Sequence, residues 1–345
     1  MMNVLLLASL ALPAGLPGTP DPADTSAEWN GLDQEISNLA STLSAAEGGV
    51  NVSGFLRARL EHSSDDAFSP GPPADLSGFD VTNARLAFTG TVGDYSFKVQ
   101  PEFASSTLLK DAKVSWNCGE QLKVTLGNYK TPFSPRFMNS EQKQAFLDRT
   151  LTATDATLKP IFFDRDVGVM LSGSVDVFSW MASVQNGEDD VADEYLITGR
   201  VEVDLIGDTL GYEGGYGLGD EQGLTLGLAW ADDGSVMDND ALTVDAKFEA
   251  NPFTAGLAFF DMGTGVGDNS PYDVYATWML TPDEWEVAVR YEDLDDTADT
   301  TAITAGVNWY LYGTDSKWQL NWRNQDSDSA TLDGSIIQAG LTLAF

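Results

Sequence analysis

Long apolar runs are absent from this chain after its first 20 residues. A membrane-spanning helix needs about 20 consecutive apolar residues, so the sequence excludes a helical membrane protein. There is one cysteine, Cys118, which excludes an internal disulfide and is interpreted as an incidental free thiol. The one histidine, His62, lies near Ser63 and Asp65. A catalytic triad needs partners that the fold positions, so an enzyme is the weakest hypothesis.

Positive charge is also scarce, and it is unevenly distributed. The formal net charge is −35, and residues 1–165 hold 13 Lys or Arg against 19 Asp or Glu, whereas residues 166–345 hold 5 against 34. Contacts with nucleic-acid phosphates require a cationic face, so no nucleic-acid partner is expected. We predict no catalytic residue, no metal site and no cofactor.

From Val50 onward, apolar residues alternate with small or polar ones, a period typical of β-strands whose two faces meet different surroundings. In the last segment, one face is wholly apolar and ends on the aromatic Phe345, as expected for the interfacial girdle of an outer-membrane barrel. Sixteen such segments can be counted: 50–61, 79–91, 95–104, 108–117, 121–130, 164–174, 176–186, 194–206, 222–232, 241–250, 253–262, 272–281, 283–293, 299–310, 315–325 and 334–345.

An even number of strands is what a closed antiparallel barrel requires, and connections that are alternately short and long fit periplasmic turns and outer loops. The connection 207–221 breaks this rule, because it is long on the side of the short turns. A soluble sandwich also alternates, but it needs only 7 to 9 strands per core. The sequence therefore predicts an all-β fold, a 16-stranded antiparallel transmembrane β-barrel over residues 50–345 in the bacterial outer membrane, in contact with its lipid.

The segment before the barrel predicts export. Residues 4–12 form an apolar stretch of the length typical of a signal peptide, which we place at 1–20. Residues 21–49 hold a capping-box spacing and then apolar residues at heptad steps. This pattern indicates a short periplasmic coiled coil that joins the subunits of a homotrimer, or a single amphipathic helix that folds back onto the barrel. The heptad positions are Trp29, Leu32, Ile36, Leu39 and Leu43.

The charges of the predicted strands fall on the face opposite the apolar one. The first five strands carry six inward cations, and later strands contribute mainly carboxylates, such as Asp245, Glu249 and Glu286. A cationic wall facing an anionic wall creates a transverse field that penalises apolar solutes and passes small polar ones.

The longest connection, residues 131–163, contains Phe133, Phe137, Phe146 and Leu147 as apolar anchors, and a helical-looking stretch at 140–149. Loops of this length are usually functional. We interpret it as a constriction loop folded into the pore, with a surface cap as the alternative.

Motifs on both sides of this loop resemble the phosphate-selective porin O and P family. They are residues 126–134 (LGNYKTPFS), Asp148-Arg149 and residues 164–169 (DRDVGV), with residues 98–103 and 109–112 in support. The resemblance is densest over 95–172. It implies a 16-stranded trimeric porin whose third outer loop folds inward, and an N-terminal coiled coil recurs in such porins.

The predicted function is an outer-membrane porin, a water-filled channel for passive diffusion of small hydrophilic solutes or ions, with anions such as phosphate as candidate solutes. Acidic outer loops would repel phosphate at the mouth, so the sequence leaves the solute open. The alternative is a plugged structural or adhesive barrel that binds a partner through its acidic loops or coiled coil. The residues predicted to line the pore are Arg57, Arg59, Arg85, Lys98, Lys113, Lys123, Lys130, Arg136, Lys143 and Arg149.

Overall fold

The computed structural model describes most of the barrel. The described residues are 49–64, 76–106, 108–119, 121–153, 165–187, 195–234, 239–264, 267–329 and 333–345. The chain divides into two units, Met1–Gly49 and Val50–Phe345, and the barrel is the second of them. The predicted signal peptide, the heptad positions of the predicted coiled coil (Trp29 to Leu43) and the end of the longest loop, 154–163, lie outside the described residues. No helix among the described residues is long and apolar enough to cross a membrane.

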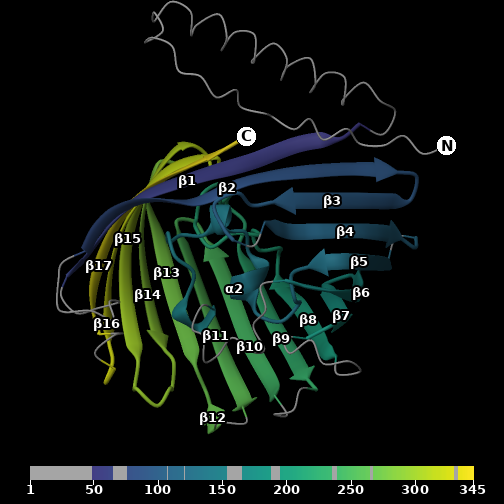
Figure 1. Ribbon diagram of the computed structural model, residues 1–345. Helices are drawn as coiled ribbons and strands as arrows, with labels where there is room; N and C mark the ends of the chain where they lie inside the picture. The colour runs from purple at the N-terminus through teal and green to yellow at the C-terminus, as the bar shows by residue number, and fades with distance from the viewer. Residues whose placement is uncertain are drawn as a thin grey trace, which may run out of the picture. The chain divides into compact units, whose positions relative to one another are not determined.

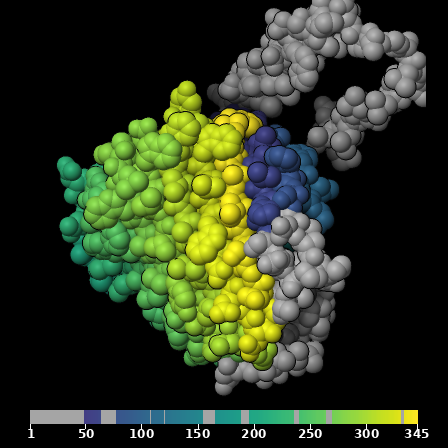
Figure 2. Space-filling view, turned by 90° about the vertical axis from the view of Figure 1, so that its left-hand side faces the viewer, coloured from purple at the N-terminus to yellow at the C-terminus, as the bar shows by residue number. Residues whose placement is uncertain are grey.

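Seventeen strands of the described residues form one sheet that closes on itself, as Figure 1 shows. β1 pairs antiparallel with both β2 and β17, and Phe55 lies opposite Ala344. In Figure 2 the yellow C-terminal strand runs beside the purple N-terminal one. β12 (Gly267–Asn269) is a short strand that pairs with the end of β11, and the other sixteen make the wall.

The sixteen wall strands are β1 (Asn51–Ser64), β2 (Leu76–Val92), β3 (Tyr95–Pro101), β4 (Leu109–Asn117), β5 (Lys123–Tyr129), β6 (Asp166–Val175), β7 (Phe178–Gln185), β8 (Leu196–Ile206), β9 (Gly223–Asp233), β10 (Asn239–Ala250), β11 (Phe253–Thr264), β13 (Tyr272–Thr281), β14 (Trp285–Asp293), β15 (Thr301–Tyr312), β16 (Ser316–Asp326) and β17 (Gly334–Ala344). The 16-stranded closed barrel is therefore confirmed, and each predicted segment agrees with its strand to within three residues at either end. β12 was not expected.

Alternating side chains separate the two faces of the wall. On β16, Trp318 and Leu320 are about half exposed, whereas Lys317 and Asn321 are buried. An apolar outer face with charged residues inside is the inverse of a soluble protein, and it is what a lipid-facing barrel requires. The apolar side chains predicted to face outward are thus the ones observed on the outer face.

Most turns at one end of the barrel are tight. Asp176 and Asp283 adopt positive φ, of 52° and 56°, a conformation that aspartate tolerates better than most residues because its side chain bonds locally to the backbone. The exception is the connection between β8 and β9, residues 207–222, which turns back inside the barrel and contacts β10, β11, β14 and the loop after β5.

The loop between β5 and β6 also lies inside the wall, where Figure 1 shows its short helix α2 within the ring of strands. It contains α2 (Pro135–Met138) and two 3-10 turns, η1 (Glu141–Lys143) and η2 (Leu151–Ala153). The helix expected over 140–149 is wrong, because only η1 forms there.

Candidate functional site

The loop between β5 and β6, which we call the inner loop (described residues 131–153), begins on an apolar patch of the inner wall. Phe133 and Phe137 are buried against Leu196, Phe260 and Met262. The Ser134 hydroxyl accepts a hydrogen bond from the Arg136 N–H at 3.2 Å and caps α2. Burial of two phenylalanine side chains contributes about 1.5–3 kcal/mol each, which holds the start of the loop against the wall.

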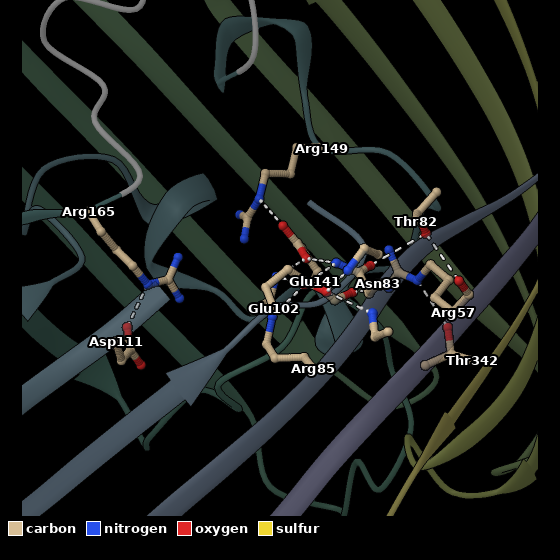
Figure 3. Close-up of polar contacts among 12 residues, drawn as sticks. Arg57, Thr82, Asn83, Arg85, Glu102, Asp111, Glu141, Arg149, Arg165 and Thr342 are labelled. Carbon is tan, nitrogen blue, oxygen red and sulfur yellow. Dashed lines mark hydrogen bonds and ion pairs between the residues drawn. The ribbon is translucent and has the colours of Figure 1, made fainter. Parts of the chain in front are cut away.

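The middle of the inner loop is fixed by one carboxylate. Glu141 accepts hydrogen bonds from Arg85 at 2.9 Å and from the Asn83 amide at 2.7 Å, and it lies 3.6 Å from Arg149. Figure 3 shows Glu141 among these groups, with Glu102 beside Arg85. Burial by itself raises the pKa of the Glu141 carboxyl, but the charges of Arg85 and Arg149 outweigh it and lower the pKa to about 2.

The end of the inner loop is fixed by a second carboxylate. Asp148 accepts hydrogen bonds from Arg59 at 2.7 Å and from Gln338 at 2.6 Å. Burial raises the pKa of Asp148, but the nearby guanidinium of Arg59 outweighs it and holds the pKa below its usual value. Because Arg59 belongs to β1 and Gln338 to β17, this carboxylate ties the loop to the seam where the barrel closes.

Between these two carboxylates, side chains of the opposite wall bind the loop backbone. Asn308 donates to the Ala145 carbonyl at 3.0 Å, Lys317 donates to the Gln144 carbonyl at 2.5 Å, and the Leu147 N–H donates to Asn321 at 2.8 Å. These bonds use the backbone groups that a helix over 140–149 would need for itself. Hydrogen bonds with the wall therefore replace the helix that the sequence pattern of this stretch predicts.

The acidic half of the wall is also paired. Asp273 accepts a hydrogen bond from Arg136 at 2.7 Å, and Asp245 accepts two from Arg200, at 2.7 and 2.9 Å. Glu286 and Glu292 are fully buried. The wet anionic wall expected from the sequence is therefore not present at these positions: Asp273, Glu286 and Glu292 are buried and bonded to inner segments, and Asp245 is bonded to Arg200 of β8.

A cavity of about 300 Å³ remains between the first part of the inner loop and strands β2 to β7. Five cationic side chains line it, against one carboxylate, Asp111. Asp111 lies 2.5 Å from both Lys98 and Arg165. The lining residues are Arg85, Lys98, Gln100, Asp111, Lys113, Tyr129, Lys130, Pro132, Met138, Ser140, Arg165, Met170 and Met181.

The predicted pore residues fall into three groups. Arg85, Lys98, Lys113 and Lys130 line the cavity. Arg57, Arg59 and Arg149 bind the backbone or a carboxylate of the inner loop, and Arg136 binds the loop to Asp273 of β13. Lys123 and Lys143 are exposed: Lys123 lines a separate hollow that also includes Glu202, and Lys143 meets the connection between β8 and β9 through its carbonyl.

Arg165 also lines the cavity, and it was absent from the residues predicted to line the pore, although it stands in the DRDVGV motif. The anchoring carboxylates Glu141 and Asp148 were missed as well, and so was Glu102, which binds Arg85 across the β2–β3 hairpin. The wall partners of Glu141 and Asp148 lie far away in sequence, so no local spacing could have marked these two carboxylates.

Comparison with known proteins places this barrel among porins. Residues 63–230, just under half of the chain, match the model of the phosphate-selective porin O and P family. No curated protein matches the sequence significantly.

The solved structures similar to this chain share its fold at low sequence identity. An anion-selective porin from Comamonas acidovorans is 16% identical, with a TM-score of 0.64 over 87% of this chain and 100% of that one. OmpT, an outer membrane protein of Vibrio cholerae in its trimer form, is 14% identical, with a TM-score of 0.61 over 86% of this chain and 99% of that one. A mutant of the Rh. blastica porin is 16% identical, with a TM-score of 0.56 over 86% of this chain and 100% of that one.

A closed barrel with a lipid-compatible outer face and a charged interior crossed by an inner loop defines an outer-membrane porin, a channel of the bacterial outer membrane. The match over residues 63–230 confirms the resemblance seen in the motifs: over this stretch the chain is similar to the phosphate-selective porins O and P.

Proposed function

We propose that the channel prefers small hydrophilic anions, and that they pass through the cavity between the inner loop and strands β2 to β7. One observation carries the proposal: five cations and one carboxylate line this space, while Asp273, Glu286 and Glu292 across the barrel are bonded and buried. A cavity of one charge sign between low-dielectric walls concentrates counter-ions and repels co-ions. The inner loop is then the constriction, with Pro132, Met138 and Ser140 as its contribution to the passage, next to Lys130, which directly precedes it.

Lys113 offers the cleanest test of this passage. It lies half-buried on β4 and lines the cavity. Lys113→Glu reverses one charge there, so we expect the anion-to-cation permeability ratio to fall, as measured by reversal potential in a planar bilayer under a KCl gradient. Lys110→Glu is the matched control, because Lys110 lies on the same strand and does not line the cavity. Equal ratios in wild type and Lys113→Glu would contradict the proposed path.

The nature of the anion is a separate question. Addition of phosphate to the same bilayer distinguishes a phosphate-binding pore, whose chloride current phosphate blocks, from a general anion pathway, which phosphate leaves unblocked. The acidic exterior disfavours phosphate at the mouth, so we expect weak block.

A plugged scaffold is the second candidate, because inner segments fill the lumen beside strands β8 to β16. Steady conductance of the purified barrel would exclude it. We also propose that the chain carries out no catalysis. His62 makes an exposed hydrogen bond of 2.7 Å to Ser77, and an activity lost on His62→Ala would be needed to argue otherwise.

Assembly as a homotrimer belongs to the same proposal. The similarity to an outer membrane protein solved in its trimer form supports it, and so does the heptad spacing over residues 29–43, which would provide a short coiled coil. Cross-linking of the full chain in detergent tests the trimer, and the same assay after removal of residues 21–49 tests the coiled coil.

A further inference from the structure

Residues 207–221, which we call the inner segment, are long where the other turns at that end of the described barrel are short. The segment runs along the inside of the wall toward the inner loop. The Leu210 N–H donates to Glu249 on β10 at 2.8 Å, and the Gly215 N–H donates to Glu286 on β14 at 2.6 Å. Both carboxylates are buried. The backbone of the inner segment thus covers and hydrogen-bonds two negative charges of the wall.

The middle of the inner segment contacts the inner loop. The Glu213 N–H donates to the Lys143 carbonyl at 3.1 Å, and the Glu213 carboxylate accepts from the Ala145 N–H at 3.2 Å. Glu213 itself is buried. Two inner elements that enter from different connections therefore meet at one residue.

The fit is close along the wall. A Cβ on Gly214 would lie 2.7 Å from the Tyr310 hydroxyl and 2.9 Å from the Glu286 carboxylate. Tyr216 packs against Tyr310 with ring centroids 5.1 Å apart. A glycine at 214 is what lets the backbone approach the wall closely enough to bind Glu286.

From these contacts we infer that the inner segment is a selectivity element. It seals the acidic half of the lumen from water and supports the inner loop through Glu213, so the only charged path left to solutes along the described barrel is the basic one. This inference rests on the proposed anion preference. Without the segment, Glu249 and Glu286 would face water together with Lys247, which pairs with Glu249 and donates to the Leu210 carbonyl. A second passage in which two carboxylates face one lysine would then open for cations.

The test replaces residues 208–221 by a two-residue turn and measures single-channel conductance and reversal potential beside wild type. We expect a larger conductance and a shift of the reversal potential toward cation preference. Heat-dependent gel mobility shows whether the variant folds. Unchanged conductance and reversal potential in a folded variant would overturn the inference.

A pair of point variants decides the matter if the shortened chain does not fold. Glu213→Ala removes the contact with the inner loop, and Asp220→Ala removes the same charge from an exposed position of the same segment. We expect a shift toward cations and noisier open-channel current in Glu213→Ala alone. Equal behaviour of the two variants would refute the role given to Glu213. A wild-type channel that prefers cations would instead refute the proposed function, whatever the variants do.

Discussion

Single carboxylates hold the inner loop, and Glu141 is the central one. Its oxygens face Arg85, Asn83 and Arg149, which come from the wall and from the loop itself. The sequence pattern assigned Arg85 and Arg149 to solute contact, and the structure shows both bound to Glu141. The Glu141 carboxylate therefore partly neutralises these two arginines, so less of their positive charge is available to a solute.

The depressed pKa of Glu141 gives a prediction about pH. Its pKa falls from 4.5 to about 2 in the folded barrel, so the ionised carboxylate stabilises the loop at pH above 4.5. That stabilisation, on the order of 3 kcal/mol, declines as pH falls from 4.5 toward 2. We expect protease cleavage within the inner loop to increase over this range.

Glu141→Gln is the control for this titration. It keeps the shape of the side chain without a charge, so cleavage should be faster at neutral pH and less dependent on acid. Cleavage of the wild type that stays constant from pH 7 to 2 would contradict the anchoring role of Glu141.

At the scale of elements, the inner loop is a segment with little regular structure, held by the strands around it. The sequence predicted its apolar anchors, and Phe133, Phe137, Phe146 and Leu147 are all buried. It predicted a helix over 140–149 that does not form, because Asn308, Lys317 and Asn321 bind the backbone there. The local sequence pattern determines the conformation of a segment only where no surrounding strand competes for the hydrogen bonds of its backbone.

The ion pair between Arg136 of α2 and Asp273 of β13 tests how far the inner loop depends on the wall. Asp273→Ala leaves Arg136 buried without its carboxylate, a loss that costs about 3–5 kcal/mol when a buried pair is broken. We expect a lower urea midpoint for unfolding in detergent, and rarer, noisier channel openings. The double variant Arg136→Met with Asp273→Ala should recover much of the stability. A double variant as unstable as the single one would show that the pair is not the cause.

At the scale of the whole molecule, the protein carries a net charge of −35 around a basic passage. This difference in charge acts on ions through the electrostatic field, and dissolved salt screens that field. The Debye length shortens from about 10 Å at 0.1 M to about 3 Å at 1 M. We therefore expect the anion-to-cation permeability ratio to decrease toward that of free solution between these salt concentrations. A ratio independent of salt would indicate selection by a fixed binding site instead of by the field.

The sequence by itself determined the wall. Period-two alternation is a local pattern, and only one assignment of the two strand faces puts apolar residues against lipid and polar residues inside. Strands such as β16, and the inward direction of Arg57, Lys98 and Arg290, therefore follow from the order of residues alone. Only the tertiary structure decided which inward charges meet one another. Glu141 reaches Arg85, Asp148 reaches Arg59, and Glu213 reaches the inner loop across the lumen. These contacts depend on how the inner loop and the inner segment fold inside the closed barrel, and no residue spacing along the chain specifies them.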